Sequence, residues 1–100
     1  MKFSIIIATL NNEETILRNL QSIKNQNYKD YEIVIIDGGS SDQTFDQVKK
    51  IEFKNLNIKN QKGMGVYNAF NEGIISANGE IIVILNVNNY RRKTTSVSPL

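Results

Sequence analysis

The chain has 100 residues, twelve of them Lys or Arg and ten Asp or Glu, and it contains neither cysteine nor histidine. One hundred residues suffice for one small domain. The lack of cysteine excludes a disulfide framework, and the lack of histidine removes the commonest general base and metal ligand. Acid–base or metal chemistry in this chain must therefore use Asp, Glu, Lys or Tyr.

The basic character is confined to one end of the chain. Residues 1–90 carry nine basic and ten acidic side chains, and Arg91, Arg92 and Lys93 supply the excess that makes the net charge +2. Nucleic-acid binding would require a basic face on the folded domain, so we expect none. No apolar run is long enough to span a bilayer, and the Ile-rich start lacks a signal-peptide cleavage site. We expect a cytoplasmic protein without a membrane span.

The first predicted unit is a strand followed by a helix. Phe3–Ala8 is continuously apolar, which is typical of a strand buried on both faces, and the turn-prone Thr9–Asn12 ends it. Asn12 is a candidate N-cap for a helix that runs to about Asn25. The apolar face of this helix carries Ile16, Leu17, Leu20 and Ile23.

A second unit repeats the pattern. Tyr31–Ile36 is predicted to be a strand, and the polar turn Asp37–Asp42 closes it. Asp42 is the expected N-cap of a helix that reaches about Ile51. Phe45 and Val48 are expected to face inward from this helix.

The third unit ends in a fourth strand. A short strand is predicted at Leu56–Lys59, a helix at Gly65–Ala77 and a strand at Glu80–Leu85. Gly79 is expected to end the helix in the left-handed conformation that glycine adopts easily. The buried side of the helix is expected to carry Val66, Ala69, Phe70 and Ile74.

This alternation predicts an α/β, Rossmann-like domain with a four-stranded, mostly parallel sheet flanked by helices. We place the domain at residues 1–90 and expect residues 91–100 to form a disordered basic tail, because the apolar periodicity stops after Asn86. Because the predicted elements stop after the fourth strand, we expect the sheet edge there to be left open and part of the core to be uncovered, and open edges and exposed apolar patches favour association. We therefore expect a homo-oligomer.

Polar clusters follow three of the predicted strands, at Thr9–Asn12, Asp37–Asp42 and Asn86–Asn89. In open α/β sheets ligands bind outside the carboxyl ends of the strands, so these clusters either line a crevice or form ordinary polar turns. Asp37 follows four apolar residues directly. Its carboxylate could accept a hydrogen bond from a uracil imide or a ribose hydroxyl, or it could only organise its own turn.

Four segments together resemble the start of family 2 (GT-A fold) glycosyltransferases. The family's opening strand and Thr-x-Asn loop are matched by Ser4–Glu13, and its Asp-x-Gly-Ser-x-Asp-x-Thr loop by Asp37–Thr44. Gly65–Gly73 is similar to its Gly-x-x-x-Ala-x-Asn-x-Gly helix, and Ala77–Glu80 to its Ala-x-Gly-Glu turn. The order and spacing of the four segments carry the resemblance, which covers about nine-tenths of the chain.

The resemblance implies a nucleotide-sugar donor, usually a UDP-sugar, bound with Mg²⁺ or Mn²⁺ and used in cell-surface polysaccharide synthesis. It implies that Thr9, Asn11 and Glu13 line the nucleotide pocket and that Asp37 contacts the base. Asp42 would shape the second loop.

The chain departs from the family pattern where the metal would bind. The family carries an Asp-x-Asp-like motif after the fourth strand, and here both Asp positions are occupied by amides, Asn88 and Asn89. Neutral amides are poorer ligands for a hard cation than carboxylates. Close relatives also tend to have Asp at the positions of Gly63 and Asn68. The acceptor half, with its general base, has no counterpart here, so we assign no catalytic residue.

Three functional hypotheses follow. The first is a truncated glycosyltransferase that keeps the nucleotide pocket but transfers no sugar on its own. The second is a non-catalytic module that binds nucleotide or assembles with itself. The third, a regulatory or redox domain of another doubly wound family, lacks support because Thr9–Glu13 does not supply a glycine fingerprint after the first strand.

Overall fold

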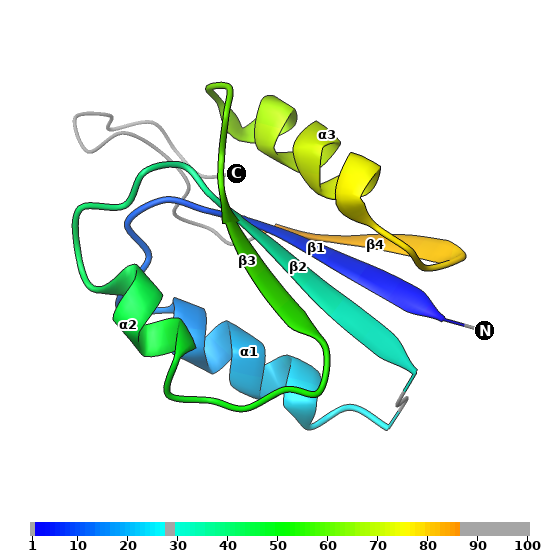
Figure 1. The fold of residues 1–100 in the computed structure, drawn as a ribbon. Coiled ribbons are helices and arrows are strands. Elements are labelled where there is room, and N and C mark those ends of the chain that lie inside the picture. The colour runs from blue at the N-terminus through cyan, green and yellow to red at the C-terminus, as the bar shows by residue number, and fades with distance from the viewer. Residues whose placement is uncertain (1, 28–29, 87–100) are drawn as a thin grey trace.

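The computed structural model describes residues 2–27 and 30–86, which form a parallel sheet flanked by helices (Figure 1). Within these residues the sheet has four strands in the order β3-β2-β1-β4, and every neighbouring pair is parallel. The predicted α/β fold is therefore confirmed. The strands are β1 (Phe3–Thr9), β2 (Tyr31–Asp37), β3 (Leu56–Asn60) and β4 (Ile81–Asn86), and the helices are α1 (Ile16–Lys24), α2 (Thr44–Val48) and α3 (Val66–Ser76).

The core lies on both faces of β1 and β2. Helices α1 and α2 cover one face and α3 covers the other, as Figure 1 shows. The alternating side chains of the two strands divide between these faces. The α1 and α2 side receives Ile5, Ile7, Ile33 and Ile35, whereas the α3 side receives Ile6, Ala8, Val34 and Ile36. Two central strands buried on both faces explain the continuous apolar runs in the sequence.

Helix α1 begins later than predicted, and Asn12 is not its side-chain cap. The backbone carbonyl of Asn12 accepts hydrogen bonds from the N–H groups of Thr15 and Ile16. The side-chain oxygen of Asn12 instead accepts from the backbone N–H of Leu10, so the amide turns back toward β1. The apolar face is as expected, with Ile16, Leu20 and Ile23 buried.

Helix α2 is one turn long, and this length explains why the prediction that Phe45 faces inward is wrong. Thr44 and Val48 are both buried, four residues apart on the same face. Phe45 lies next to Thr44 in sequence and therefore points away, with 46% of its surface exposed. The Lys49 ammonium lies 4.6 Å from the centre of its ring.

Helix α3 sits close to the sheet because its contact face is small. Ala69 and Gly73 are its buried residues, while Val66 and Phe70 are partly buried and pack against the same core. Ile74 was expected on this face but is more than one-third exposed. α3 is the longest helix among the described residues, and no helix there is long and apolar enough to cross a bilayer.

Gly79 is required for a close approach and not for a left-handed cap, which corrects the expectation from the sequence. Helix α3 ends at Ser76, and the φ angle of Gly79 is not positive. A Cβ atom at this position would lie 2.5 Å from Ser4 Oγ, 2.8 Å from Ser4 N and 2.9 Å from Lys2 O. The turn before β4 therefore presses directly on the backbone at the start of β1.

A buried carboxylate secures the same turn. Glu32 Oε2 accepts hydrogen bonds from Ser4 Oγ at 2.5 Å and from the Asn78 N–H at 2.6 Å, and Ser4 Oγ accepts from the Gly79 N–H. Burial acts to raise the pKa of Glu32, but the hydrogen bonds from Ser4 and Asn78, with the nearby Lys2 charge, bring that pKa below its ordinary value. The charged side chain thus ties β1, β2 and the turn before β4 together.

Replacing Glu32 with Gln should reduce stability in a pH-dependent way. The lowered pKa means that ionised Glu32 stabilises the fold above the pKa of the unfolded chain and loses this effect as pH falls through the folded pKa. Because hydrogen bonds to charged groups are stronger than neutral ones, Glu32→Gln should lower the free energy of unfolding at pH 7 by roughly 1–2 kcal/mol. Urea unfolding should show the difference shrinking below the ordinary glutamate pKa of 4.5. A difference independent of pH would contradict this role.

Replacing Gly79 with Ala should destabilise the fold by roughly 1–3 kcal/mol, because the added methyl group meets backbone atoms that cannot rotate away. Gly63→Ala is the matched control, since a Cβ there would meet only side-chain atoms of Asn68 and Glu72, at 3.4–3.5 Å. Urea unfolding of both variants tests the difference. Equal stabilities would show that the turn before β4 can move away from β1.

Candidate functional site

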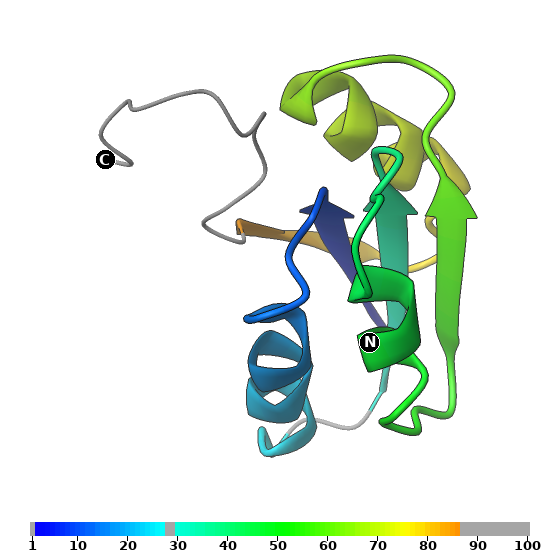
Figure 2. The same ribbon diagram turned by 90° about the vertical axis from the view of Figure 1, so that its left-hand side faces the viewer.

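The loops that follow β1 and β2 lie side by side at the carboxyl edge of the sheet (Figure 2). Thr9 and Asp37 are the last paired residues of the two strands, and the Gly38 N–H donates to the Thr9 carbonyl at 2.8 Å. The five residues predicted to bind nucleotide all belong to these loops or to the strand ends that begin them. They are Thr9, Asn11, Glu13, Asp37 and Asp42.

Asp37 organises its own turn, one of the two possibilities that its position in the sequence allowed. Its side chain is buried, with 7% of its surface exposed. Asp37 Oδ2 accepts from the N–H groups of Gly39 and Ser40 at 3.1 and 2.9 Å, and Oδ1 accepts from Ser40 Oγ at 2.6 Å. Gly39 permits this turn because its φ is 100°, which is unfavourable for residues with a Cβ. The carboxylate is held rigidly at the end of β2.

Asn11 joins the first loop to the second. Its Oδ1 accepts from the N–H of Ser41 at 2.8 Å and of Asp42 at 3.3 Å, while its own N–H donates to Ser40 Oγ at 2.8 Å. Asn11 has a φ of 54°, in the left-handed region that Asn tolerates better than most residues. Asn11 and Ser40 therefore connect β1 to the turn that holds Asp37.

Glu13 and Asp42 form a second connection between the loops. The Glu13 N–H donates to Asp42 Oδ2 at 3.2 Å, and Glu13 Oε1 accepts from the Gln43 N–H at 2.9 Å. Asp42 Oδ1 accepts from the N–H and hydroxyl of Thr44, the first residue of α2. Burial acts to raise the pKa of Asp42, but the bonds from Thr44 and from the Glu13 N–H leave that pKa lowered. Asp42 is thus an ionised anchor for both loops.

Thr9 and Asn12 lie beneath the two loops. Thr9 is fully buried and its hydroxyl donates to Asn12 Oδ1 at 2.6 Å, while the Asn12 N–H donates to Thr44 Oγ1 at 2.8 Å. Asn12 Nδ2 is buried and has no partner among the described residues. The Thr9 side chain therefore supports the loop from below, and the exposed polar groups above it come from other residues.

Ser40 and Thr44 were not among the predicted site residues, although their hydroxyl groups join the loops. Each accepts a backbone N–H from the first loop and donates to an Asp of the second loop. Both belong to the segment Asp37–Thr44 that resembles the family motif, and this membership was the available signal. We call the two loops with these contacts the loop clasp, which comprises residues 9–13 and 37–44.

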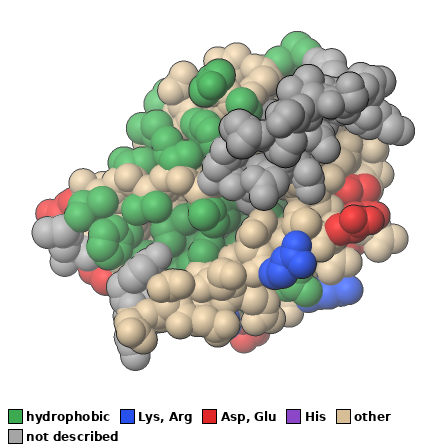
Figure 3. Space-filling model, turned by 180° about the vertical axis from the view of Figure 1, so that it is seen from behind, with side chains coloured by type: hydrophobic (Ala, Val, Ile, Leu, Met, Phe, Trp, Pro, Cys, Tyr) green, Lys and Arg blue, Asp and Glu red, His purple; other side chains and the backbone are tan. Residues whose placement is uncertain are grey.

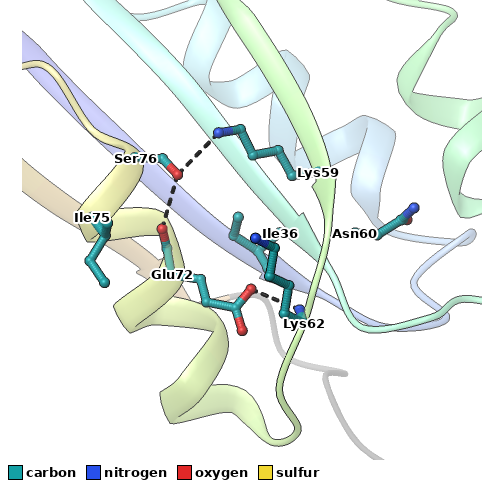
Figure 4. A pocket seen from close by; sticks show the side chains of 7 residues that line it. All are labelled: Ile36, Lys59, Asn60, Lys62, Glu72, Ile75 and Ser76. Carbon is teal, nitrogen blue, oxygen red and sulfur yellow. Dashed lines mark hydrogen bonds between the residues drawn. The ribbon is translucent and has the colours of Figure 1, made fainter.

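A pocket of about 270 Å³ lies elsewhere, between the ends of β3 and α3 (Figure 4). Ile36 and Ile75 form its apolar part, and Lys59, Lys62 and Glu72 line it with charged groups. The backbone N–H groups of Lys62 and Gly63 donate to the Glu72 carboxylate and lower its pKa. None of the five predicted nucleotide-binding residues lines this pocket, so it is separate from the loop clasp.

The acidic side chains of the described residues are spread apart and not clustered. Within residues 2–27 and 30–86, no three acidic side chains are grouped so that they could hold a metal ion. Asp37 and Asp42 point their oxygens at backbone and hydroxyl donors of their own loop and of the neighbouring one. Asn88 and Asn89, at the positions of the family's metal motif, lie outside the described residues.

Comparison with known proteins identifies the family. Residues 4–88 match the family described as glycosyl transferase family 2. This chain belongs to that family. A Methanococcus voltae relative, dolichyl N-acetyl-alpha-D-glucosaminyl phosphate 3-beta-D-2,3-diacetamido-2,3-dideoxy-beta-D-glucuronosyltransferase, is 44% identical over 94 residues, covering 87% of this chain and 29% of that protein. The Escherichia coli UDP-Glc:alpha-D-GlcNAc-diphosphoundecaprenol beta-1,3-glucosyltransferase WfaP is 38% identical, covering 87% of this chain and 35% of that protein.

Solved structures agree with this assignment. S. aureus TarS 1–349 in complex with UDP-GlcNAc is 32% identical with a TM-score of 0.69, and the match covers 86% of this chain and 26% of that one. The mannosyltransferase PcManGT from Pyrobaculum calidifontis, in complex with GDP-Man and Mn²⁺, is 27% identical with a TM-score of 0.76, covering 84% and 26%. The chain thus spans about three-tenths of the length of the first curated relatives that it matches.

Replacing Asn11 should weaken the loop clasp. Asn11→Gly removes the side-chain bonds to the N–H groups of Ser41 and Asp42 but tolerates the positive φ, whereas Asn11→Ala also introduces strain. We expect Asn11→Gly to cost about 1 kcal/mol of unfolding free energy, and Asn11→Ala roughly 1 kcal/mol more. Hydrogen exchange at the N–H groups of Ser41 and Asp42 should accelerate in both variants. Unchanged exchange would show that Asn11 does not hold the second loop.

Proposed function

We propose that this family 2 domain binds the nucleotide of a UDP-sugar donor above the loop clasp. The observation that carries the proposal is the position of Asp37, a buried carboxylate held at the carboxyl edge of the sheet beside the end of β1. β1 has β2 on one side and β4 on the other, so the strand order reverses around it, and ligands of open α/β sheets bind at such points. The nucleoside would lie over Asp37, with its diphosphate toward the ends of β1 and β4.

The hydrogen bonds of Asp37 leave room for a ligand. A carboxylate offers about four lone-pair positions, and the turn occupies three of them: two on Oδ2 and one on Oδ1. The remaining position on Oδ1 could accept the imide N–H of uracil or a ribose hydroxyl. Because the turn fixes the carboxylate in advance, binding would lose little conformational entropy there.

The other four predicted residues would act mainly by shaping the surface of the loop clasp on which the nucleotide lies. Asn11, Glu13 and Asp42 direct their side-chain oxygens at backbone N–H groups of the second loop or of the start of α2, and Thr9 is buried below them. In this proposal they hold the two loops at a fixed separation. The nucleoside would then meet the outer surface of the clasp, with Asp37 as its acceptor.

In a sugar-transfer reaction these residues would bind the donor, and none of them is assigned a role in the transfer step. The names of relatives refer to a dolichyl phosphate and a diphosphoundecaprenol acceptor, which supports a role in cell-surface glycan synthesis. An inverting transfer needs a base within reach of the acceptor hydroxyl. Asp37, Asp42 and Glu72 all receive hydrogen bonds from nearby backbone N–H groups, and we assign none of them as this base.

Calorimetric titration with UDP tests the proposal. We expect saturable binding of UDP. Asp37→Asn should lower the affinity for UDP between about tenfold and 100-fold, because one hydrogen bond to a charged group is lost. Asp46→Asn makes the same substitution on the exposed face of α2 and should leave affinity unchanged. CDP, whose ring N3 carries no hydrogen, should bind more weakly than UDP if Asp37 accepts from the base. Equal affinities for UDP in Asp37→Asn and the parent chain would contradict the proposal.

The same titration with Mn²⁺ tests the metal motif. We expect Mn²⁺ to change the affinity for UDP little, because Asn88 and Asn89 offer neutral amide oxygens in place of carboxylates. A tenfold gain in affinity with Mn²⁺ would show that other groups hold the cation.

A further inference from the structure

The loop that follows β3, residues 61–65, begins at the same edge of the sheet as the loop clasp (Figure 2). The N–H of Gln61, the first residue after β3, donates to the Asp37 carbonyl at 2.7 Å. The next N–H along β2, that of Gly38, donates to the Thr9 carbonyl at 2.8 Å. The peptide group between Asp37 and Gly38 is therefore held from both sides, by β1 through Thr9 and by the loop after β3 through Gln61.

The same peptide group begins the turn that surrounds the Asp37 carboxylate. The carboxylate accepts from the N–H groups of Gly39 and Ser40, which follow almost directly in the chain. A peptide group is planar and moves as one unit, so turning its C=O away from Gln61 would also displace the chain that leads to these two donors. The orientation of the Asp37 carboxylate therefore depends on Gln61 as well as on its own turn.

Two side chains of α3 hold the loop after β3 at its backbone. The Glu72 carboxylate accepts from the N–H groups of Lys62 and Gly63 at 2.9 and 2.8 Å, one on each oxygen. Asn68 Nδ2 donates to the Met64 carbonyl at 2.7 Å. Because Asn68 and Glu72 are four residues apart, they lie on the same face of α3. Figure 4 shows the Glu72 carboxylate turned toward Lys62.

Helix α3 gives Glu72 a fixed base on the sheet. Ala69 is fully buried in the core, and a Cβ atom on Gly73, the residue after Glu72, would overlap the Ile6 side chain of β1. The helix backbone therefore packs directly against β1, and α3 cannot move closer to the sheet. A carboxylate suits the position of Glu72 because its two oxygens accept both loop N–H groups at once, whereas an amide has a single acceptor oxygen.

We propose that Glu72 is a positioning residue, which fixes the loop after β3 so that Gln61 holds the Asp37 turn in the orientation that meets the nucleotide. Glu72 does not touch the nucleotide itself. It acts through the loop backbone on Gln61, and Gln61 acts on the Asp37 carbonyl. The effect of Glu72 on the turn is independent of any ligand, whereas its effect on UDP affinity rests on the function proposed above.

Hydrogen exchange on the full chain without ligand tests the positioning. Glu72→Gln keeps the size and helix propensity of the side chain, but it leaves one of the two loop N–H groups facing an amide NH₂ group in place of an acceptor. Exchange should accelerate about threefold to tenfold at the N–H groups of Gln61 and Ser40, neither of which bonds to Glu72.

Glu52→Gln is the matched control for this exchange experiment. Glu52 is exposed and lies before β3, at the opposite end of that strand, so its substitution should leave exchange at both N–H groups unchanged. Acceleration confined to Lys62 and Gly63, the direct partners of Glu72, would overturn the proposal, because the effect would not reach Asp37.

Calorimetric titration with UDP supplies a readout that general loosening of the fold would not give. We expect Glu72→Gln to lower the affinity for UDP about threefold to tenfold, the net value of one ordinary hydrogen bond. In the Asp37→Asn background the same change should lower affinity less than about twofold, because the acceptor that Glu72 positions is already lost. Fully additive losses would overturn the proposal. If Asp37→Asn alone leaves UDP affinity unchanged, the proposed nucleotide site is wrong, and hydrogen exchange still decides whether Glu72 positions the turn.

Discussion

The structure depends on two central strands that are apolar on both faces. β1 and β2 can be buried only if a helical layer covers each side of the sheet, and α1 with α2 supplies one layer while α3 supplies the other. Each buried Ile contributes roughly 1.5–3 kcal/mol, so these two strands provide most of the favourable free energy of a small core. The helices are centred over β1 and β2, so within the described residues Leu85 of β4 packs against the α1 side of the core while Ile81–Ile84 are more than one-third exposed. Figure 3 shows hydrophobic side chains gathered on this side of the molecule.

The same arrangement places the polar groups at one edge of the sheet. Because β1 and β2 are parallel and in register from Phe3 to Thr9, both strands end at the same level, and their loops meet. The loops then share hydrogen bonds in both directions, so neither can move without the other. A preformed surface of this kind suits a ligand that is read through fixed hydrogen-bond directions, as a nucleoside base is. The chain belongs to family 2, and the fixed carboxylate of Asp37 suits the nucleotide binding that we propose.

The sequence was sufficient for the elements and insufficient for their mutual contacts. Apolar runs and helical spacing predicted each of the strands and helices because they report burial, which is a local property of the pattern. The direction of a polar side chain is not local. Asn12 could have capped α1 or turned toward Leu10, and only the packed loop decides between them. Glu32 carries no signal that Ser4 and Asn78 would surround it, since these contacts join distant parts of the chain.

Phe45 and Gly79 illustrate two further limits. A five-residue helix presents one narrow face, so the periodicity that serves longer helices places Phe45 wrongly. Gly79 follows a helix, where glycine usually adopts a left-handed conformation, yet here it makes room for the backbone of β1. In the candidate site, the family motif indicated the two loops that the structure brings together, with Asp37 at the start of the second. It did not indicate that Ser40 and Thr44 would connect them.

The pairing of β1 with β4 has a consequence for how the chain folds. Phe3 lies beside Ile81, so β1 receives one of its two neighbours only once synthesis has reached residue 81. The chain between β1 and β4 must close into a long loop before the two strands can form their stabilising contacts. Parallel sheets of this kind fold slowly for their size. During synthesis, the edge of the Ile-rich strand β1 that later pairs with β4 would therefore remain open. Until residues 81–86 emerge, this edge of β1 can associate with other chains, which is the kind of exposure that chaperones limit.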